Sequence, residues 1–132
     1  NKIANCTTAG IGSVTAGCLI DSNEILTCVD GINSAFTGAA NRGPIISNNT
    51  IDSNTGDGIE FTATIAAGYG SIRIINNNIT NNGGYGIKFT HATATLIALN
   101  SYGITVQGNN TYNNTSGASL PVGLGECGSP HS

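Results

Sequence analysis

The sequence predicts an all-β single domain, a short parallel solenoid of about four to five stacked coils with no substantial helix. Three observations predict it. A unit of about 28 residues recurs along the chain. Each unit contains short bursts in which apolar and polar residues alternate, the period of a strand. Asparagine and glycine, residues that favour turns, bound each burst. So small a unit cannot bury its own apolar face, whereas stacked units can.

The composition fits one folded domain. The chain has 132 residues, of which 39% are apolar and 8% are charged, and its formal net charge is −3. This apolar content argues against disorder. The four basic residues are scattered, so no basic stripe for nucleic acid exists. No apolar run approaches the roughly 20 residues of a membrane helix. We therefore expect neither nucleic-acid binding nor membrane insertion.

The repeat is clearest when NNTIDSNTGDGIEFT (Asn48–Thr62) is aligned with NNNITNNGGYGIKFT (Asn76–Thr90) at an offset of 28. A third copy, ITVQGNNTYNN, follows at an offset of 32, and a weaker copy that shares DGI precedes by 27. We therefore predict repeats over residues 19–117. Residues 1–18 would form an N-terminal segment with a partial first coil, and residues 118–132 a Gly/Pro/Ser-rich tail.

The strands follow from the alternation, in chain order. Strands are expected at GIEF (58–61), IRI (72–74), GIKF (86–89) and ITV (104–106), and the Thr and Ile of ATATLIAL (92–99) favour a strand over a helix there. Equivalent residues of stacked coils lie about 4.8 Å apart. The predicted interior columns pair Ile51 with Ile79, Ile59 with Ile87, and Phe61 with Phe89.

The asparagines have a structural explanation. Asparagine tolerates left-handed backbone and hydrogen-bonds to its own backbone, so it suits sharp turns. At the same turn in successive coils, its side chains can also hydrogen-bond to one another along the stack. Two such ladders are predicted, one of Asn49, Asn77 and Asn109 and the other of Asn54, Asn82 and Asn114.

The units NNTIDSNTGDGIEF, NNNITNNGGYGIKF and GNNTYNN resemble the repeats of the right-handed parallel β-helix family, the pectate-lyase-like solenoids. The resemblance implies the fold and its handedness. It leaves the function open, because this family includes polysaccharide lyases, glycosidases, epimerases, phage tailspikes and surface fibres.

The four cysteines are Cys6, Cys18, Cys28 and Cys127, at spacings that match no metal-binding motif. The chain lacks methionine and begins at Asn1, so we expect a processed, extracellular or cell-surface product with two disulfides. Four cysteines allow three pairings, of which Cys6–Cys18 with Cys28–Cys127 is favoured. Buried thiols are the alternative.

The acidic residues offer one candidate for chemistry. Asp30 and Asp57 both stand in DGI and align on adjacent coils, where two carboxylates could act as acid and nucleophile or bind calcium. Asp-Gly is also a turn dipeptide, and the next coil has Tyr85 at this position, so a turn role is favoured. Glu60 and Lys88 align as a surface ion pair. We therefore predict no catalytic residue, no metal, no cofactor and no enzymatic activity.

Six Asn-x-Ser/Thr sequons occur, mildly above the number expected by chance. A glycan could not fit at Asn109, which lies in a predicted ladder. The candidate glycosylation sites are Asn5, Asn48, Asn78 and Asn113.

The two ends of the chain bear on function, because neither resembles the polar cap that normally covers a solenoid. Uncapped ends favour head-to-tail stacking, which gives a filament when the contact does not close. The leading hypothesis is a secreted structural protein, the subunit of a self-assembling extracellular filament, whose partners are copies of itself and glycans. The alternative is a carbohydrate-binding or polysaccharide-degrading β-helix module, which could be part of a longer protein. The third is an ice-binding solenoid, for which the TAT segments at 62–64 and 93–95 form too irregular an array.

Overall fold

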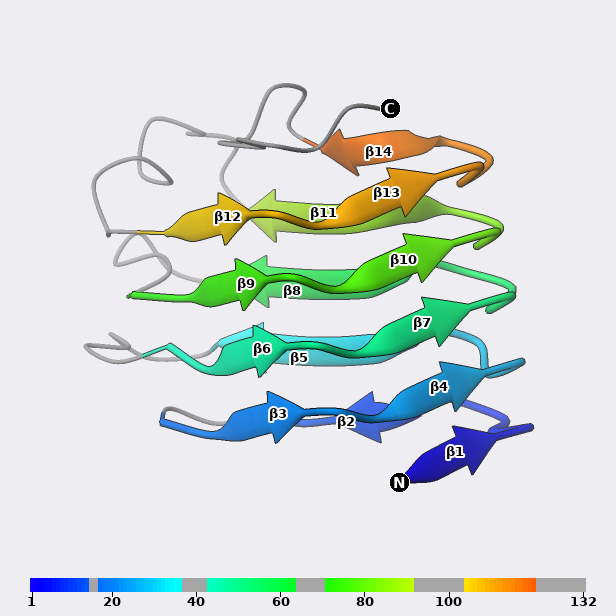
Figure 1. The fold of residues 1–132 in the computed structure, drawn as a ribbon, viewed down its shortest axis with the longest axis horizontal. Helices are drawn as coiled ribbons and strands as arrows, with labels where there is room; N and C mark the ends of the chain where they lie inside the picture. The colour runs from blue at the N-terminus through cyan, green and yellow to red at the C-terminus, as the bar shows by residue number, and fades with distance from the viewer. Residues whose placement is uncertain (15–16, 37–42, 64–70, 92–103, 121–132) are drawn as a thin grey trace.

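A computed structural model describes residues 1–14, 17–36, 43–63, 71–91 and 104–120. These residues form layered coils, each of which runs once around the molecule and lies on the previous one (Figure 1). The strands are β1 (Lys2–Ala4), β2 (Ile11–Gly12), β3 (Leu19–Asp21), β4 (Glu24–Leu26), β5 (Ile32–Phe36), β6 (Ile45–Ser47), β7 (Thr50–Asp52), β8 (Ile59–Ala63), β9 (Arg73–Ile75), β10 (Asn78–Thr80), β11 (Tyr85–His91), β12 (Thr105–Gln107), β13 (Asn110–Tyr112) and β14 (Gly117–Leu120).

Each coil adds one strand to each of three sheets. The first sheet has the order β1-β4-β7-β10-β13, the second β2-β5-β8-β11-β14 and the third β3-β6-β9-β12. Strands β1 and β2 form a partial first coil, and four three-stranded coils follow. Every strand pair is parallel. This architecture confirms the predicted all-β parallel β-helix of four to five coils.

The core consists of side-chain columns that run along the stack. The strand register sets Ile51 beside Ile79 in the first sheet and Ile59 beside Ile87 in the second, and all four are fully buried. Each such burial is worth about 1.5–3 kcal/mol relative to exposure. Phe61 and Phe89 stack in the same way, with ring centroids 5.5 Å apart at an interplanar angle of 29°.

The columns change character in the last coil. Thr111 follows Ile79 and Ser119 follows Ile87 in register, so hydroxyl side chains continue two isoleucine columns. Strand β14 runs to Leu120, three residues past the predicted end of the repeats. Residues 92–99, where we predicted a strand, lie outside the described residues.

Two corners of each of the last three coils share one local pattern, a left-handed residue followed by a buried asparagine. At the first corner Asn48 and Asn76 have φ of 56° and 55°, and the buried Asn49 and Asn77 follow them. The second corner repeats this with Asn81 (φ 56°) before Asn82. Consecutive asparagines therefore have different tasks: the first turns the chain, and the second points inward. The described residues contain no helix long and apolar enough to cross a membrane.

Candidate functional site

The first asparagine ladder runs through the corner between the third and first sheets. The main-chain N–H and side-chain amide of Asn49 donate to Asn77 Oδ1, at 3.0 and 2.9 Å. The same two groups of Asn77 donate to Asn109 Oδ1, both at 2.9 Å. The structure therefore brings together the three predicted residues. It also extends the ladder backwards, because Asn23 donates to Asn49 Oδ1 and Asn1 to Asn23 Oδ1.

The second ladder has the same bonds at the corner between the first and second sheets. Asn54 donates its N–H and amide to Asn82 Oδ1, and Asn82 donates both to Asn114 Oδ1. In the coil before Asn54, the position belongs to Cys28, whose N–H donates to Asn54 Oδ1 at 2.9 Å. One coil earlier it belongs to Cys6, because Ala4 pairs with Leu26 two residues before each cysteine.

No disulfide joins Cys6, Cys18 and Cys28. The predicted Cys6–Cys18 bond is therefore absent from the structure. Its physical reason is that Cys6 follows β1 of the first sheet whereas Cys18 precedes β3 of the third. Cys127, the predicted partner of Cys28, lies outside the described residues.

The four candidate glycosylation sites are all exposed: Asn5, Asn48, Asn78 and Asn113. Asn78 Oδ1 accepts a hydrogen bond from Asn110 Nδ2 at 2.7 Å on the outer face of the first sheet. The buried Asn109 and Asn114, by contrast, are ladder residues. Of the threonines considered for ice binding, Thr62 pairs with Thr90 in register, and Thr64, Thr93 and Thr95 lie outside the described residues.

A cluster of charged and amide side chains lies where the chain enters the second sheet. Asp30 and Asp57 occupy the same position on adjacent coils, as predicted from DGI. Asp30 Oδ1 accepts the N–H of Asp57 at 2.9 Å, and Asp57 Oδ1 accepts the N–H of Tyr85 at 2.7 Å. One oxygen of each carboxylate therefore holds the turn of the next coil.

The second oxygens of Asp30 and Asp57 bond to side chains of the second sheet, from the column that lies three residues after the aspartates. Asn33 donates to Asp30 Oδ2 at 2.8 Å and to Glu60 Oε2 at 2.9 Å. Lys88 Nζ lies 3.0 Å from Asp57 Oδ2 and 2.8 Å from Glu60 Oε1. We call these five residues the acid network. The strand register brings these side chains together, because Glu60 pairs with Asn33 on one side and with Lys88 on the other.

Lys88 supplies the cation of this network. Its side chain is 27% exposed and those of Asp57 and Glu60 are 10% and 18% exposed, so the pair is more buried than the predicted surface ion pair. The hydrogen bond that the Lys88 ammonium donates to Glu60 raises the pKa of Lys88, against the opposing effect of burial, and the hydrogen bond to Asp57 and the charges of both carboxylates raise it further. Lys88 therefore stays charged well above neutral pH.

The sequence reasoning missed Asn33 and the reach of Lys88 to Asp57. The signal was present in DGIN, DGIE and YGIK, where the residue after GI occupies one column. Oxygens of Asp30, Asp57 and Glu60 all lie within 4.8 Å of one another, and carboxylate oxygens are ligands that calcium prefers. In the structure, however, Lys88 and Asn33 fill the bonding positions between them, so the group acts as the counter-charge of a lysine.

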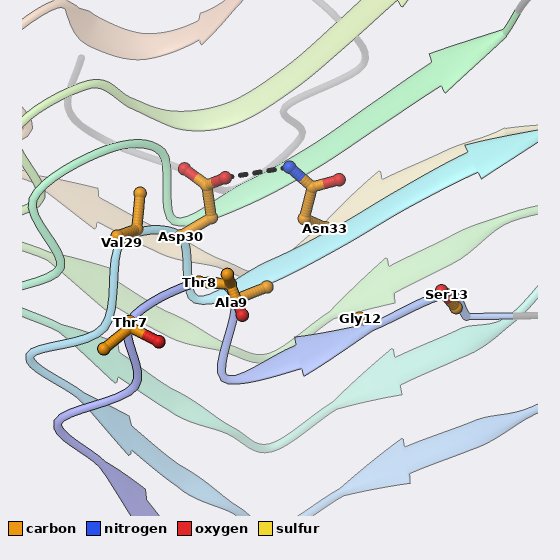
Figure 2. Close-up of a pocket in the computed structure, with 8 residues that line it drawn as sticks. All are labelled: Thr7, Thr8, Ala9, Gly12, Ser13, Val29, Asp30 and Asn33. Carbon is orange, nitrogen blue, oxygen red and sulfur yellow. Dashed lines mark hydrogen bonds between the residues drawn. The ribbon is translucent and has the colours of Figure 1, made fainter.

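A groove of about 500 Å³ borders the acid network at the partial first coil. Figure 2 shows Asp30 and Asn33, joined by their hydrogen bond, near the turn that carries Thr7 and Thr8. The lining groups are mainly hydroxyl, carboxylate and amide: Thr7, Thr8, Ala9, Gly12, Ser13, Val29, Asp30 and Asn33. Such a surface can exchange hydrogen bonds with a hydroxyl-rich ligand.

Comparison with known proteins gives one match. The family model described as "Right handed beta helix region" matches residues 1–114. No curated protein and no solved structure matches the chain.

Proposed function

Because the chain belongs to the right-handed β-helix family, we propose that it is a secreted structural protein, the subunit of a filament that self-assembles outside the cell. One observation carries this proposal: the strand order at the two ends of the stack. In the described residues, β1, β2 and β3 are the first strands of the three sheets and have a strand neighbour on one side only. Strands β13, β14 and β12 are the last strands of the same sheets.

A second copy placed on the first in the same orientation continues the first and second sheets, because β1 of one copy meets β13 of the copy below and β2 meets β14, both parallel. In the third sheet, which has four strands in the described residues against five in each of the others, one strand position separates β12 from β3 of the next copy. Ile3 and Ile11, the first members of two apolar columns, pack against the core but are only partly buried. Stacking covers their exposed surface. Since this contact joins two different faces, it repeats without closing.

The asparagine ladder supports the same contact. Each ladder N–H donates to the Oδ1 of the next coil, as in the bond from Asn77 to Asn109. Within the part of the chain that the structure describes, no following coil accepts the N–H of Asn109. In the proposed filament, Asn1 of the next copy takes this position, because Asn1 begins the same column.

The experiment exploits the alternation of backbone groups along β1. Asn1 O and Asn5 N bond to the following coil, so the N–H groups of Lys2 and Ala4 point to the open side. Ala4→Pro removes the main-chain N–H of residue 4, which points to the open side, and leaves the hydrogen bonds between β1 and β4 intact. Ala4→Ser keeps this N–H. Negative-stain microscopy and sedimentation of the concentrated chain should show filaments for the wild type and Ala4→Ser. Ala4→Pro should remain monomeric with an unchanged circular dichroism spectrum. Monodisperse wild-type particles would contradict the proposal.

This role does not require catalysis by the acid network. Its carboxylates already accept hydrogen bonds from the turn of the next coil and from the side chains of Asn33 and Lys88. These bonds support a structural role in joining the coils. The exposed Asn5, Asn48, Asn78 and Asn113 remain candidate attachment sites for N-glycans on the filament surface.

A second candidate function, carbohydrate binding, is favoured by the groove beside Asp30. Its hydroxyl, amide and carboxylate groups suit a neutral polysaccharide. Calorimetry with soluble neutral oligosaccharides should show binding that Asn33→Ala weakens and the distant Asn78→Ala leaves unchanged. The absence of heat for every oligosaccharide tested would count against this candidate.

A further inference from the structure

The residue type in the second ladder changes from asparagine to cysteine toward the N-terminal end of the stack. Asparagine occupies the column in three successive coils, at Asn54, Asn82 and Asn114, and cysteine occupies it in the two coils before them. The offset from Cys6 to Cys28 is 22 residues, the same offset that pairs β1 with β4. The two cysteines are therefore direct neighbours along the stack.

Their side chains also have equivalent orientations. Cys6 Sγ points to Ala4 O at 3.8 Å, and Cys28 Sγ points to Leu26 O at 3.4 Å. Ala4 and Leu26 are register partners, so the two thiols lie one coil apart on the same side of the backbone. Neighbouring strands are about 4.8 Å apart, within the Cα separations of about 4.4–6.8 Å that a disulfide spans.

We propose that Cys6 and Cys28 form a disulfide that fastens the partial first coil to the rest of the stack. The proposal is independent of the filament. A thiol cannot provide the amide oxygen that accepts the ladder N–H in later coils, so this pair of coils lacks one inter-coil bond that the others have. The disulfide replaces it with a covalent bond.

The surroundings of the two sulfurs fit this assignment. Cys28 is 1% exposed and belongs to the core, and Cys6 is partly exposed and packs against it. The hydrogen bond between the two thiols, with a smaller effect of burial, raises the pKa of Cys6. The proximity of the two cysteines rests on the strand register that pairs β1 with β4, and oxidation should be faster at alkaline pH, where the Cys6 thiolate forms.

The reaction balances with a small-molecule disulfide as oxidant. The Cys6 thiolate attacks oxidised glutathione, forms a mixed disulfide and releases one glutathione thiolate. The Cys28 thiolate then attacks Cys6 Sγ in the mixed disulfide and releases the second glutathione. Two electrons pass from the cysteine pair to the oxidant, which is reduced to two thiols.

The pairing can be read by mass spectrometry of the whole chain. After native oxidation with glutathione disulfide and alkylation, unreduced protein is cleaved after glutamate, which separates residues 1–24 from residues 25–60. The proposal predicts a bond between these two peptides, with fragmentation placing it on Cys6 and Cys28. It also predicts the same bond in the Cys18→Ser/Cys127→Ser double variant. A Cys6–Cys18 bond, or alkylation of both Cys6 and Cys28 in folded protein, would overturn it.

A matched variant separates the disulfide from mere packing. Cys28→Asn introduces the residue that the column has in later coils, so it should fold and supply the missing acceptor for the Cys6 N–H. In the double variant, oxidation should raise the thermal midpoint by roughly 10 °C relative to reduced protein. In the same background with Cys28→Asn or Cys6→Ser added, that shift should vanish. An equal shift in these variants would also overturn the proposal.

Discussion

The side-chain amide of Asn77 donates to Asn109 Oδ1 at 2.9 Å, and the main-chain N–H of Asn77 donates to the same oxygen at 2.9 Å. These residues are 32 apart in sequence and direct neighbours along the stack. One asparagine oxygen thus satisfies two buried donors of the coil before it. This pair of hydrogen bonds recurs along two corners of the molecule, so substitution of a ladder asparagine should have a measurable effect on stability.

Asn77→Ala should destabilise the protein by at least about 2 kcal/mol. It removes the acceptor of two donors of Asn49, and the side chain's own bonds to Ile46 O and Asn109, and buried orphaned donors cost about 1–3 kcal/mol. The matched control is Asn78→Ala, because Asn78 is exposed and should cost less than about 0.5 kcal/mol. Equal losses in urea unfolding would contradict the ladder account.

Gly58→Ala should also destabilise strongly. A Cβ on Gly58 would lie 2.5 Å from Ile79 Cγ2 and 2.6 Å from Gly86 O in the next coil, so the coils would have to separate at this corner. The expected cost is about 1–3 kcal/mol. Gly12→Ala provides the control, since the nearest atoms to its Cβ lie 3.9 Å away. A fall in thermal midpoint should appear for the first variant and not for the second.

Lys88→Met should change how stability depends on alkaline pH. The pKa of Lys88 is raised above its ordinary value of 10.5 in the folded protein. Its contribution is therefore complete below about pH 10.5 and is lost as pH rises through the folded value. Wild-type stability should fall over this range, and Lys88→Met should be less stable at neutral pH with a weaker fall. Lys2→Met, which breaks the exposed pair with Glu24, should behave like the wild type. Parallel alkaline curves for all three would refute the role of Lys88.

Asp52→Asn should weaken the acid sensitivity of the fold. Burial tends to raise the pKa of Asp52, but hydrogen bonds from Ser53, Thr80 and Asn81 outweigh it and lower the pKa below its ordinary 3.8. Its stabilisation is thus present above pH 3.8 and is lost as pH falls through the folded pKa. Denaturant titrations between pH 5 and about 2 should show a smaller loss for Asp52→Asn than for the exposed-residue control Glu24→Gln. If Asp52→Asn lost as much stability between pH 5 and about 2 as the wild type, this contribution of Asp52 would be ruled out.

The sequence predicts the parts of the fold in which one residue type recurs at one offset. Ile51 with Ile79 and Asn54 with Asn82 are visible because identical residues stand 28 apart. Where the column changes residue, identity cannot reveal it. The Asn33, Glu60 and Lys88 column is of this kind, and its bonds depend on side-chain reach across coils. The Cys6 and Cys28 neighbours are hidden further, because their coil is six residues shorter than the unit of 28.

Function is less predictable than fold for a physical reason. Stacking chemistry fixes nearly every buried position, so the sequence signals describe the coil rather than a ligand. The proposed assembly depends on which groups face outward at two ends of the stack, a property of register that repeat identity does not encode.

Cryo-electron microscopy of the concentrated, full chain tests the proposed assembly most directly. Five strands in the first sheet, at about 4.8 Å each, predict a helical rise of about 24 Å per subunit. The map should show β13 of one copy beside β1 of the next, with Asn109 facing Asn1. Monomers at every concentration, or filaments in which these two strands are not adjacent, would contradict the account.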